Sequence, residues 1–411
     1  MRLVAASCVV SVALSLPRPF PRLRRPRCAP LTLEATEGAA DAMSDAALRD
    51  LVARAWGGST NRSVLPAWSG QNLWLWAQWR GTVLSHCLER ALLTAAGGAV
   101  VLWSAKGGVR GGLPDPSHPV VARLAAVDAM WGHHLTLTTF VATFFLSHGY
   151  AFWRQMYVVA RTIQGRLNDL GLLLAAHARA GDAGAAAAVA ECARLARLSH
   201  LFFWAAVVRA APSDDFPTSL NALLSARGLA ALEAAGALAP GERSALLGPA
   251  APPRDAWYLA ALGRLAAAVA DGVAGDQFRG GAGFESEALK AVVELRQNML
   301  SVPDELAARM PLAYVHFVQC LVDLLCATAP LALFPRGGAF GIALCAVIAL
   351  FFGGVVELSK AFLDPFGNRH VSNDSFRADV QVDVLLAESN RGLAAWHAHV
   401  DLLPRAAAAS D

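Results

Sequence analysis

The sequence predicts an all-α, polytopic membrane protein with four transmembrane helices and a helical region outside the membrane. Apolar residues make up 55% of the 411-residue chain and charged residues only 16%, a balance far from that of a soluble domain. Four long apolar stretches occur in the chain, and about 20 apolar residues in a helix cross a hydrocarbon core of about 30 Å. Between the second and third stretches no strand-length alternation of polar and apolar residues occurs, so that region is expected to be helical as well.

The first 45 residues are expected to form a targeting leader or a disordered segment. An apolar run from Leu3 to Leu16 has the length of a signal-peptide core, and the arginine-rich segment behind it contains no acidic residue before Glu34. This two-part pattern resembles the leader of proteins sent to plastids in algae with secondary plastids, and it predicts an integral membrane protein of a plastid or thylakoid membrane. The alternative is a plain secretory signal or a basic disordered N-terminus, with the protein in the plasma membrane or another endomembrane.

Four stretches are predicted to span the membrane. They cover residues 88–103, 134–153, 311–334 and 339–358. The first span contains Arg90 near its start, and the third contains Asp323. An acidic residue inside a membrane is costly and needs a partner. We therefore expect Asp323 to pair with a basic group such as His316, or to lie at a contact between subunits.

Residues 154–310 form a long connection between the second and third spans. The segment is rich in alanine and leucine, and prolines divide it into helical units. Arginines are numerous in it, whereas the loop between the third and fourth spans has only Arg336. The positive-inside rule therefore places the segment and both termini on the cytosolic or stromal side. Residues 391–411 are expected to form a C-terminal tail.

Short motifs follow one another in order between residues 66 and 390. They are Trp79, Arg80 and Gly81 before the first span, Phe140 to Phe145 within the second, Trp153 at its end, Pro311 and Tyr314 at the start of the third, and Asp364, Pro365, Phe366 and Gly367 after the fourth. In order and spacing these motifs resemble those of the bestrophin family of anion channels. The region from residue 66 to residue 390 is therefore interpreted as a bestrophin-like channel domain.

The resemblance implies a homopentamer with one central pore, lined by the second span of each subunit, that conducts anions passively. Chloride is the expected ion, with bicarbonate and nitrate as other candidates. The expected partners are further copies of the chain, these anions and the lipid bilayer. A nucleic acid is not expected, because the net charge is only +3 and no run of Lys and Arg follows residue 30.

Five residues of the second span recur at spacings of three and four, which places them on one face of a helix. They are Thr136, Phe140, Thr143, Phe144 and Ser147. Hydroxyl groups can donate hydrogen bonds to an anion, and phenyl edges carry partial positive charge that can replace part of its hydration. The resemblance assigns this face to the pore neck. The alternative is that hydroxyl and aromatic residues here pack against another helix.

Three residues at the start of the second span set expectations for the upper neck. The family more often has an aliphatic residue in place of Thr136, so the neck is expected to be more polar here. His133 and His134 are assigned to the pore entrance. Their protonation below about pH 6.5 would add up to ten positive charges per pentamer and attract anions. The alternative is that both histidines are interfacial anchors that face headgroups or solvent.

No metal and no cofactor are expected. Animal members of the family hold calcium in a largely acidic clasp directly after the fourth-span motif. The corresponding positions here are Asn368, Arg369, His370, Val371 and Ser372, which provide no cluster of hard oxygen ligands. The family's calcium clasp is therefore expected to be absent.

Enzyme chemistry is not expected either. The sequence contains no Gly-rich phosphate loop, no HExxH motif and no nucleophile elbow. The alternative to a channel is a poorly conducting membrane scaffold or regulator of the same shape. The alanine-rich insertions and the altered clasp would permit that role.

Overall fold

The computed structural model describes residues 33–41, 43–57, 63–65, 67–79, 82–105, 109–110, 113–208, 220–367 and 379–399. Nearly all regular structure in these residues is helical. The exception is a small hairpin, in which β1 (Val109–Arg110) pairs with β2 (Leu113–Pro114) in antiparallel register. The predicted all-α class is confirmed.

The described helices follow one another along the chain. They are α2 (Leu33–Asp41), α3 (Asp45–Gly57), α4 (Asn72–Trp76), α5 (Val83–Ser104), α6 (Pro119–His177), α7 (Ala183–Val207), α8 (Ala226–Ala234), α9 (Glu242–Leu247), α10 (Trp257–Ala274), α11 (Gly281–Ala307), α12 (Leu312–Gly337), α13 (Phe340–Phe362) and α14 (Val382–His399), with the 3-10 helices η1 (Leu220–Leu224) and η2 (Arg254–Ala256).

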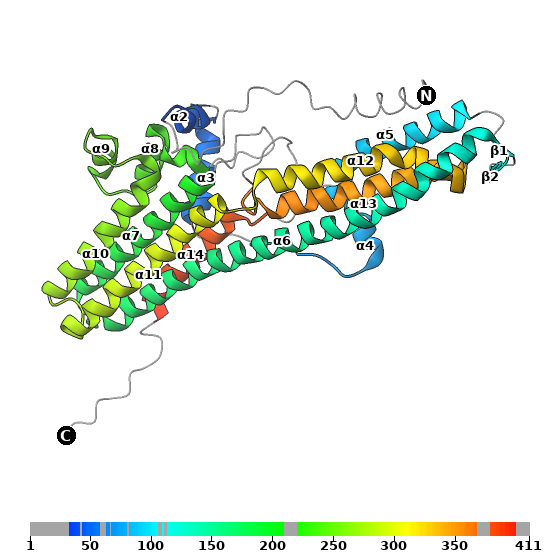
Figure 1. Ribbon diagram of the computed structural model, residues 1–411. Helices are drawn as coiled ribbons and strands as arrows, with labels where there is room; N and C mark the ends of the chain where they lie inside the picture. The colour runs from blue at the N-terminus through cyan, green and yellow to red at the C-terminus, as the bar shows by residue number, and fades with distance from the viewer. Residues whose placement is uncertain are drawn as a thin grey trace.

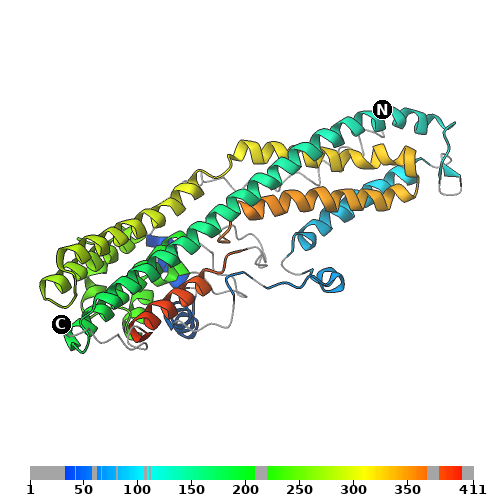
Figure 2. The same ribbon diagram turned by 90° about the horizontal axis from the view of Figure 1, so that it is seen from below.

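The molecule is elongated and has two ends that differ in composition (Figures 1 and 2). At one end α5, α12, α13 and the first half of α6 lie side by side. All four helices are long and apolar enough to cross a membrane. Large apolar side chains remain exposed on them, among them Leu92 (63%) and Phe351 (60%). Such an apolar exterior is stable only in lipid or against another protein, which agrees with the predicted spans.

The helices of this apolar end extend beyond the predicted spans. The first span was expected to begin at Leu88, but α5 begins at Val83. The second was expected over residues 134–153, which is only the middle of α6. Hydropathy marks where a helix meets lipid, whereas the helix itself continues wherever one face still finds a protein partner.

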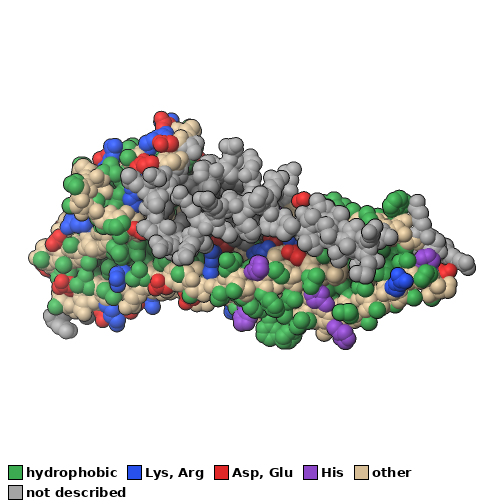
Figure 3. All heavy atoms as spheres, turned by 45° about the horizontal axis from the view of Figure 1, so that its top comes forward, with side chains coloured by type: hydrophobic (Ala, Val, Ile, Leu, Met, Phe, Trp, Pro, Cys, Tyr) green, Lys and Arg blue, Asp and Glu red, His purple; other side chains and the backbone are tan. Residues whose placement is uncertain are grey.

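The other end is a helical bundle outside the apolar region. There α7, α10, α11, α14 and the second half of α6 surround one core, which includes the fully buried Trp204 and Leu167. On the face in Figure 3, Lys, Arg, Asp and Glu side chains gather over this end, while the opposite end is mostly hydrophobic. This bundle is the helical region predicted from residues 154–310.

Both ends of the chain contribute helices to this bundle. Residues 1–32 lie outside the described part, but α2 and α3 overlap the range expected for the leader, and Ala40 and Met43 are buried in the bundle core. Similarly, α14 continues to His399, so a helix occupies the first part of the range expected to be a tail.

Candidate functional site

Helix α6 is the element that positions the predicted neck residues. It begins with Pro119 at its first position, where a proline has no hydrogen bond to lose, and it contains no further proline before it ends at His177. Its 59 residues correspond to roughly 90 Å of helix, about three times the thickness of a hydrocarbon core. One continuous helix therefore runs through the apolar end and into the bundle.

Close contacts on its inner side fix the rotation of α6. Trp131 is buried, and its indole N–H donates to the carbonyl of Leu325 on α12 at 3.1 Å. Farther along, a Cβ at Gly149 would lie 3.0 Å from the carbonyl oxygen of Ser359 on α13. The glycine thus allows the two helices to approach closely.

The opposite side of α6 is uncovered. Its exposed residues within the apolar end include one face, which we call the α6 stripe: His133, Thr136, Leu137, Phe140, Thr143, Phe144, Ser147 and His148, with the exposed Thr139 at its edge. The exposed fraction is 62% for Phe140 and 48% for Phe144. All five residues predicted for the neck lie on this stripe, whereas their neighbours Ala142 and Phe145 are buried against the other helices.

Aromatic rings follow one another along the stripe. The ring centroids of Phe140 and Phe144 are 4.8 Å apart with an interplanar angle of 53°, and the ring of His148 lies 6.2 Å beyond that of Phe144. His148 was not singled out from the sequence. Its spacing of four residues from Phe144 was the signal that could have identified it.

Two of the three hydroxyl groups of the stripe donate hydrogen bonds within the helix. Thr136 donates to the carbonyl of Gly132 at 3.1 Å, and Thr143 donates to that of Thr139 at 2.8 Å. The sequence suggested that these hydroxyls donate to an anion. In this structure both donate along α6 instead, so the phenyl edges of the stripe are left as groups with partial positive charge.

The two histidines predicted for the entrance are separated by the helix. His133 is exposed on the stripe, but His134 is half-buried on the side that faces α12. Neither lies at the start of the helix, because α6 begins 14 residues before His133, at Pro119. Neighbouring helical residues point about 100° apart, so only His133 of this pair lies on the stripe.

Comparison with solved structures identifies the fold. A bestrophin homologue from Klebsiella pneumoniae with a Y211A mutation superposes with a TM-score of 0.56 at 14% identity, over 76% of this chain and 99% of that chain. The same homologue solved by zinc phasing gives a TM-score of 0.53 at 14% identity, over 77% and 97% of the two chains. The chain has a bestrophin-like fold. No protein-family model and no curated protein match the sequence.

Within this bestrophin-like fold, the motif residues lie at junctions between helices. Trp79 is 44% exposed just before α5, and Arg80 and Gly81 lie outside the described residues. The ring of Trp153 is stacked between those of Tyr150 and Tyr157 on α6.

The third and fourth spans each have a motif at the bundle side. Pro311 caps α12, and the ring of Tyr314 packs 6.0 Å from that of Phe145 on α6. After α13, Asp364 and Phe366 are buried, at 2% and 4% exposure.

Residues 364–367 turn the chain from the apolar end into the bundle. The ring of Phe366 lies 5.0 Å from that of Trp204 on α7, and the carbonyl of Pro365 accepts a hydrogen bond from Val380, just before α14. Gly367 has φ +68°, a conformation that favours glycine. Residues 368–372, the expected position of the family clasp, lie outside the described residues. Within the described ranges, no three His, Cys, Asp or Glu residues group as a metal site.

The acidic residue of the third span has a partner other than the one predicted. The carboxylate of Asp323 lies 3.3 Å from the guanidinium of Arg90 on α5, and it accepts a hydrogen bond from Gln319 at 2.8 Å. His316 instead lies 3.6 Å from the sulfur of Cys320, one turn away on the outer side of α12. Asp323 therefore pairs with a basic group, as expected, but the group is Arg90 of the neighbouring helix and not the suggested His316.

Proposed function

We propose that the protein is a passive anion channel whose pore is lined by the α6 stripes of several copies of the chain, five in a homopentamer. The observation that carries the proposal is the stripe itself. A helix in the apolar end presents a face of aromatic, hydroxyl and imidazole side chains, with one aliphatic residue, Leu137, that no other part of the described chain covers.

The polar residues of the stripe argue against contact with lipid. His133 and His148 would lose their hydration without compensation in hydrocarbon. A ring of subunits places the same residues on a common axis, where water can reach them. Residues such as Leu92 and Phe351, on the other spans, then face the lipid.

The charge pattern along the stripe suits an anion that must both enter and leave. No Lys, Arg, Asp or Glu occurs between Asp128 and Arg154, so no fixed charge holds an ion within the neck. Arg154 is exposed and continues the same helical face beyond His148. Its positive charge raises the local anion concentration at the bundle side.

Chloride is the proposed principal ion, with bicarbonate and nitrate as candidates of the same charge class. The proposed location is a plastid or thylakoid membrane, on the basis of the arginine-rich leader. In a thylakoid membrane, acidification of the lumen would change the pH around His133.

The test is the reversal potential of the purified full-length protein in planar bilayers under a chloride gradient, repeated with bicarbonate on one side. We expect the potential to move toward the anion equilibrium potential. Phe144→Ala should change conductance or selectivity, because it removes a ring from the proposed neck.

Phe351→Ala is the matched control, since Phe351 is also an exposed phenylalanine, at 60% against 48% for Phe144, and it lies on α13. It should behave as wild type. If an intact pentamer carries no current, the proposal fails and the chain is a scaffold with the same fold. If both alanine variants change conduction alike, α6 does not line the pore.

A further inference from the structure

A short tryptophan-rich segment precedes the first span and stands apart from the other helices. It consists of residues 68–79, includes α4, and is called the tryptophan segment below. Four of the chain's eleven tryptophans lie in it, namely Trp68, Trp74, Trp76 and Trp79. Figures 1 and 2 show α4 (blue) beside the apolar end and away from the core of the bundle, and no described helix packs extensively against it.

Large apolar side chains of this segment are exposed together. The exposed fraction is 74% for Trp68, 88% for Leu73, 45% for Leu75 and 44% for Trp79. In the bundle, by contrast, Trp204 is completely buried. A group of exposed apolar side chains marks a contact with lipid or with another protein. The segment is therefore a surface that still needs a partner.

Hydrogen bonds hold the segment at the start of α5. The N–H of Ala77 donates to the carbonyl of Leu73 at 3.2 Å and closes α4, and the hydroxyl of Thr82, the N-cap residue of α5, donates to the carbonyl of Trp79 at 2.9 Å. From there α5 runs to the hairpin at the far tip of the apolar end (Figure 1). The tryptophan segment therefore lies at the bundle side of a helix that is long and apolar enough to cross a membrane.

A tryptophan at the opposite end of α5 gives the level of the far membrane surface. Trp103 is 67% exposed in the last turn of this helix. The 22 residues of α5 correspond to roughly 33 Å, close to the hydrocarbon thickness of about 30 Å. Tryptophans gather at both surfaces of a membrane, because the indole combines a large apolar ring with one N–H donor. Trp79 and Trp103 thus bracket one bilayer, and the tryptophan segment lies at its bundle-side surface.

The composition of the segment matches the boundary between headgroups and acyl chains. No Lys, Arg, Asp or Glu occurs from Ser63 to Trp79, and small polar residues such as Gly70, Gln71 and Asn72 separate the apolar ones. The segment is too short to span a hydrocarbon core, which needs about 20 apolar residues. Without a cation it has no means of selecting an anionic headgroup. Indole rings can enter the upper acyl region while their N–H groups meet phosphate or ester oxygens.

We propose that the tryptophan segment is a lipid-binding anchor that lies in the bundle-side interface of the bilayer without crossing it. The partner is phospholipid, which the segment binds through the change from polar headgroups to apolar chains and not through headgroup charge. Continuity with α5 favours lipid over a second copy of the chain. Leu88 and Leu92 on that helix are exposed, at 47% and 63%, so the segment extends a surface already suited to lipid.

The experiment places the photoreactive residue benzoylphenylalanine at Leu73 of the full-length protein in phosphatidylcholine nanodiscs. Illumination should join the protein to phosphatidylcholine, which intact-protein mass spectrometry detects as the added mass of one lipid. The same probe at Phe351, exposed on α13, should give the same adduct. At Leu247, which is 41% exposed on α9 in the bundle, it should give none.

Two variants at Trp68 test the anchor while the probe stays at position 73. Trp68→Asp puts a carboxylate into the interface, so it should lower the yield of the lipid adduct several-fold. Trp68→Phe keeps an apolar ring and should retain most of the yield. The yield from a probe at Phe351 should be the same in both variants, which shows that the spans remain folded in the bilayer.

Three results would overturn the proposal. The absence of a lipid adduct at position 73, as expected at position 247, would place the segment in water. A cross-link between two chains in place of the lipid adduct would assign the surface to a second copy. Equal lipid yields in Trp68→Asp and Trp68→Phe would show that Trp68 does not hold the segment in the interface. These measurements need no ion current, so their outcome is independent of whether the chain conducts.

Discussion

The indole N–H of Trp204 donates a hydrogen bond to Nε2 of His200 across 2.7 Å, one turn earlier on α7. Both residues are completely buried in the bundle core. Because the bond requires a lone pair on Nε2, the imidazole is neutral and carries its proton on Nδ1. Burial lowers the pKa of His200 to about 3.

This pair makes the stability of the bundle depend on pH. Between the ordinary histidine pKa of about 6.5 and the folded value of about 3, the unfolded chain binds a proton that the folded chain does not. The free energy of unfolding should therefore decrease as the pH falls through this window, by at most about 1.4 kcal/mol per pH unit in each subunit. His200→Gln keeps an acceptor for Trp204 but does not titrate. Thermal midpoints from pH 7 to pH 4 should decrease less steeply in this variant, and an unchanged slope would contradict the assignment.

The Arg90–Asp323 pair should couple α5 to α12. Neutralising either partner leaves the other charge within the apolar end, so Arg90→Gln and Asp323→Asn should each lower the free energy of unfolding by about 1–3 kcal/mol. The double variant should lose less than the sum of the two single losses. Thermal midpoints of the wild type, the two single variants and the double variant form a double-mutant cycle. Strictly additive losses in this cycle would show that the ion pair contributes nothing to stability.

Thr136 should keep the upper part of the stripe wetted. Its hydroxyl hydrogen is donated to Gly132, but its oxygen still attracts water, and Thr136→Ile replaces it by an apolar branch. We expect the chloride conductance to fall by about half or more, because apolar constrictions dewet. Thr328→Ile is the control, since Thr328 makes the same kind of bond, to Leu324, on α12. Unchanged conductance in Thr136→Ile would remove this residue from the neck.

Gly367 should be intolerant of a side chain. Its φ of +68° costs an L-residue about 1–2 kcal/mol, so Gly367→Ala should lower the thermal midpoint. Gly354→Ala is the matched control, since a Cβ there would meet only a methyl group of Val83 at 3.8 Å and alanine is the better helix former. If Gly367→Ala were as stable as wild type, the turn would not require a glycine.

The spans were predictable because hydropathy reports the solvent around a segment. The same signal could not show that α6 continues to His177, because beyond Trp153 the helix is held by the bundle and not by lipid. It also could not identify Arg90 as the partner of Asp323, since their pairing depends on how α5 and α12 pack.

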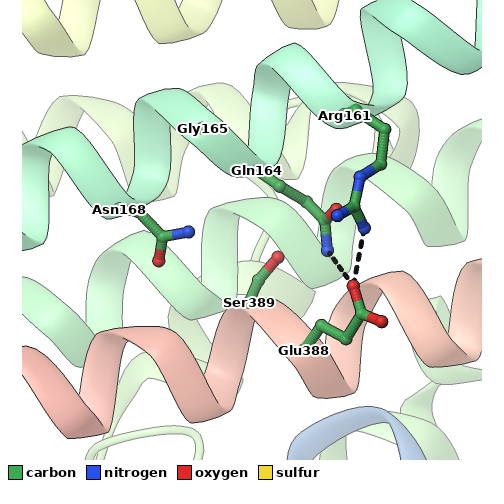
Figure 4. Close-up of a pocket in the computed structure, with 6 residues that line it drawn as sticks. All are labelled: Arg161, Gln164, Gly165, Asn168, Glu388 and Ser389. Carbon is green, nitrogen blue, oxygen red and sulfur yellow. Dashed lines mark hydrogen bonds and ion pairs between the residues drawn. The ribbon is translucent and has the colours of Figure 1, made fainter.

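The stripe was predictable in part. Periodicity placed Thr136, Phe140 and Phe144 on one face, but it could not show which face stays uncovered or that the hydroxyls bond within α6. The contact between α6 and α14 had no signal in the sequence, because Arg161 and Gln164 meet Glu388 from more than 200 positions away (Figure 4).

The unbroken length of α6 has a mechanical consequence. A helix with no internal proline lacks the commonest cause of a sharp kink, so it can transmit a rotation along its length. A turn of about 20° carries a side-chain tip at a radius of roughly 5 Å through roughly 2 Å, and it does so at every level of the rod. Phe144 and Gln164 are fixed to this rod roughly six turns apart. A rotation of α6 at Gln164, where α14 contacts it, is therefore transmitted to Phe144, because no proline lies between the two residues.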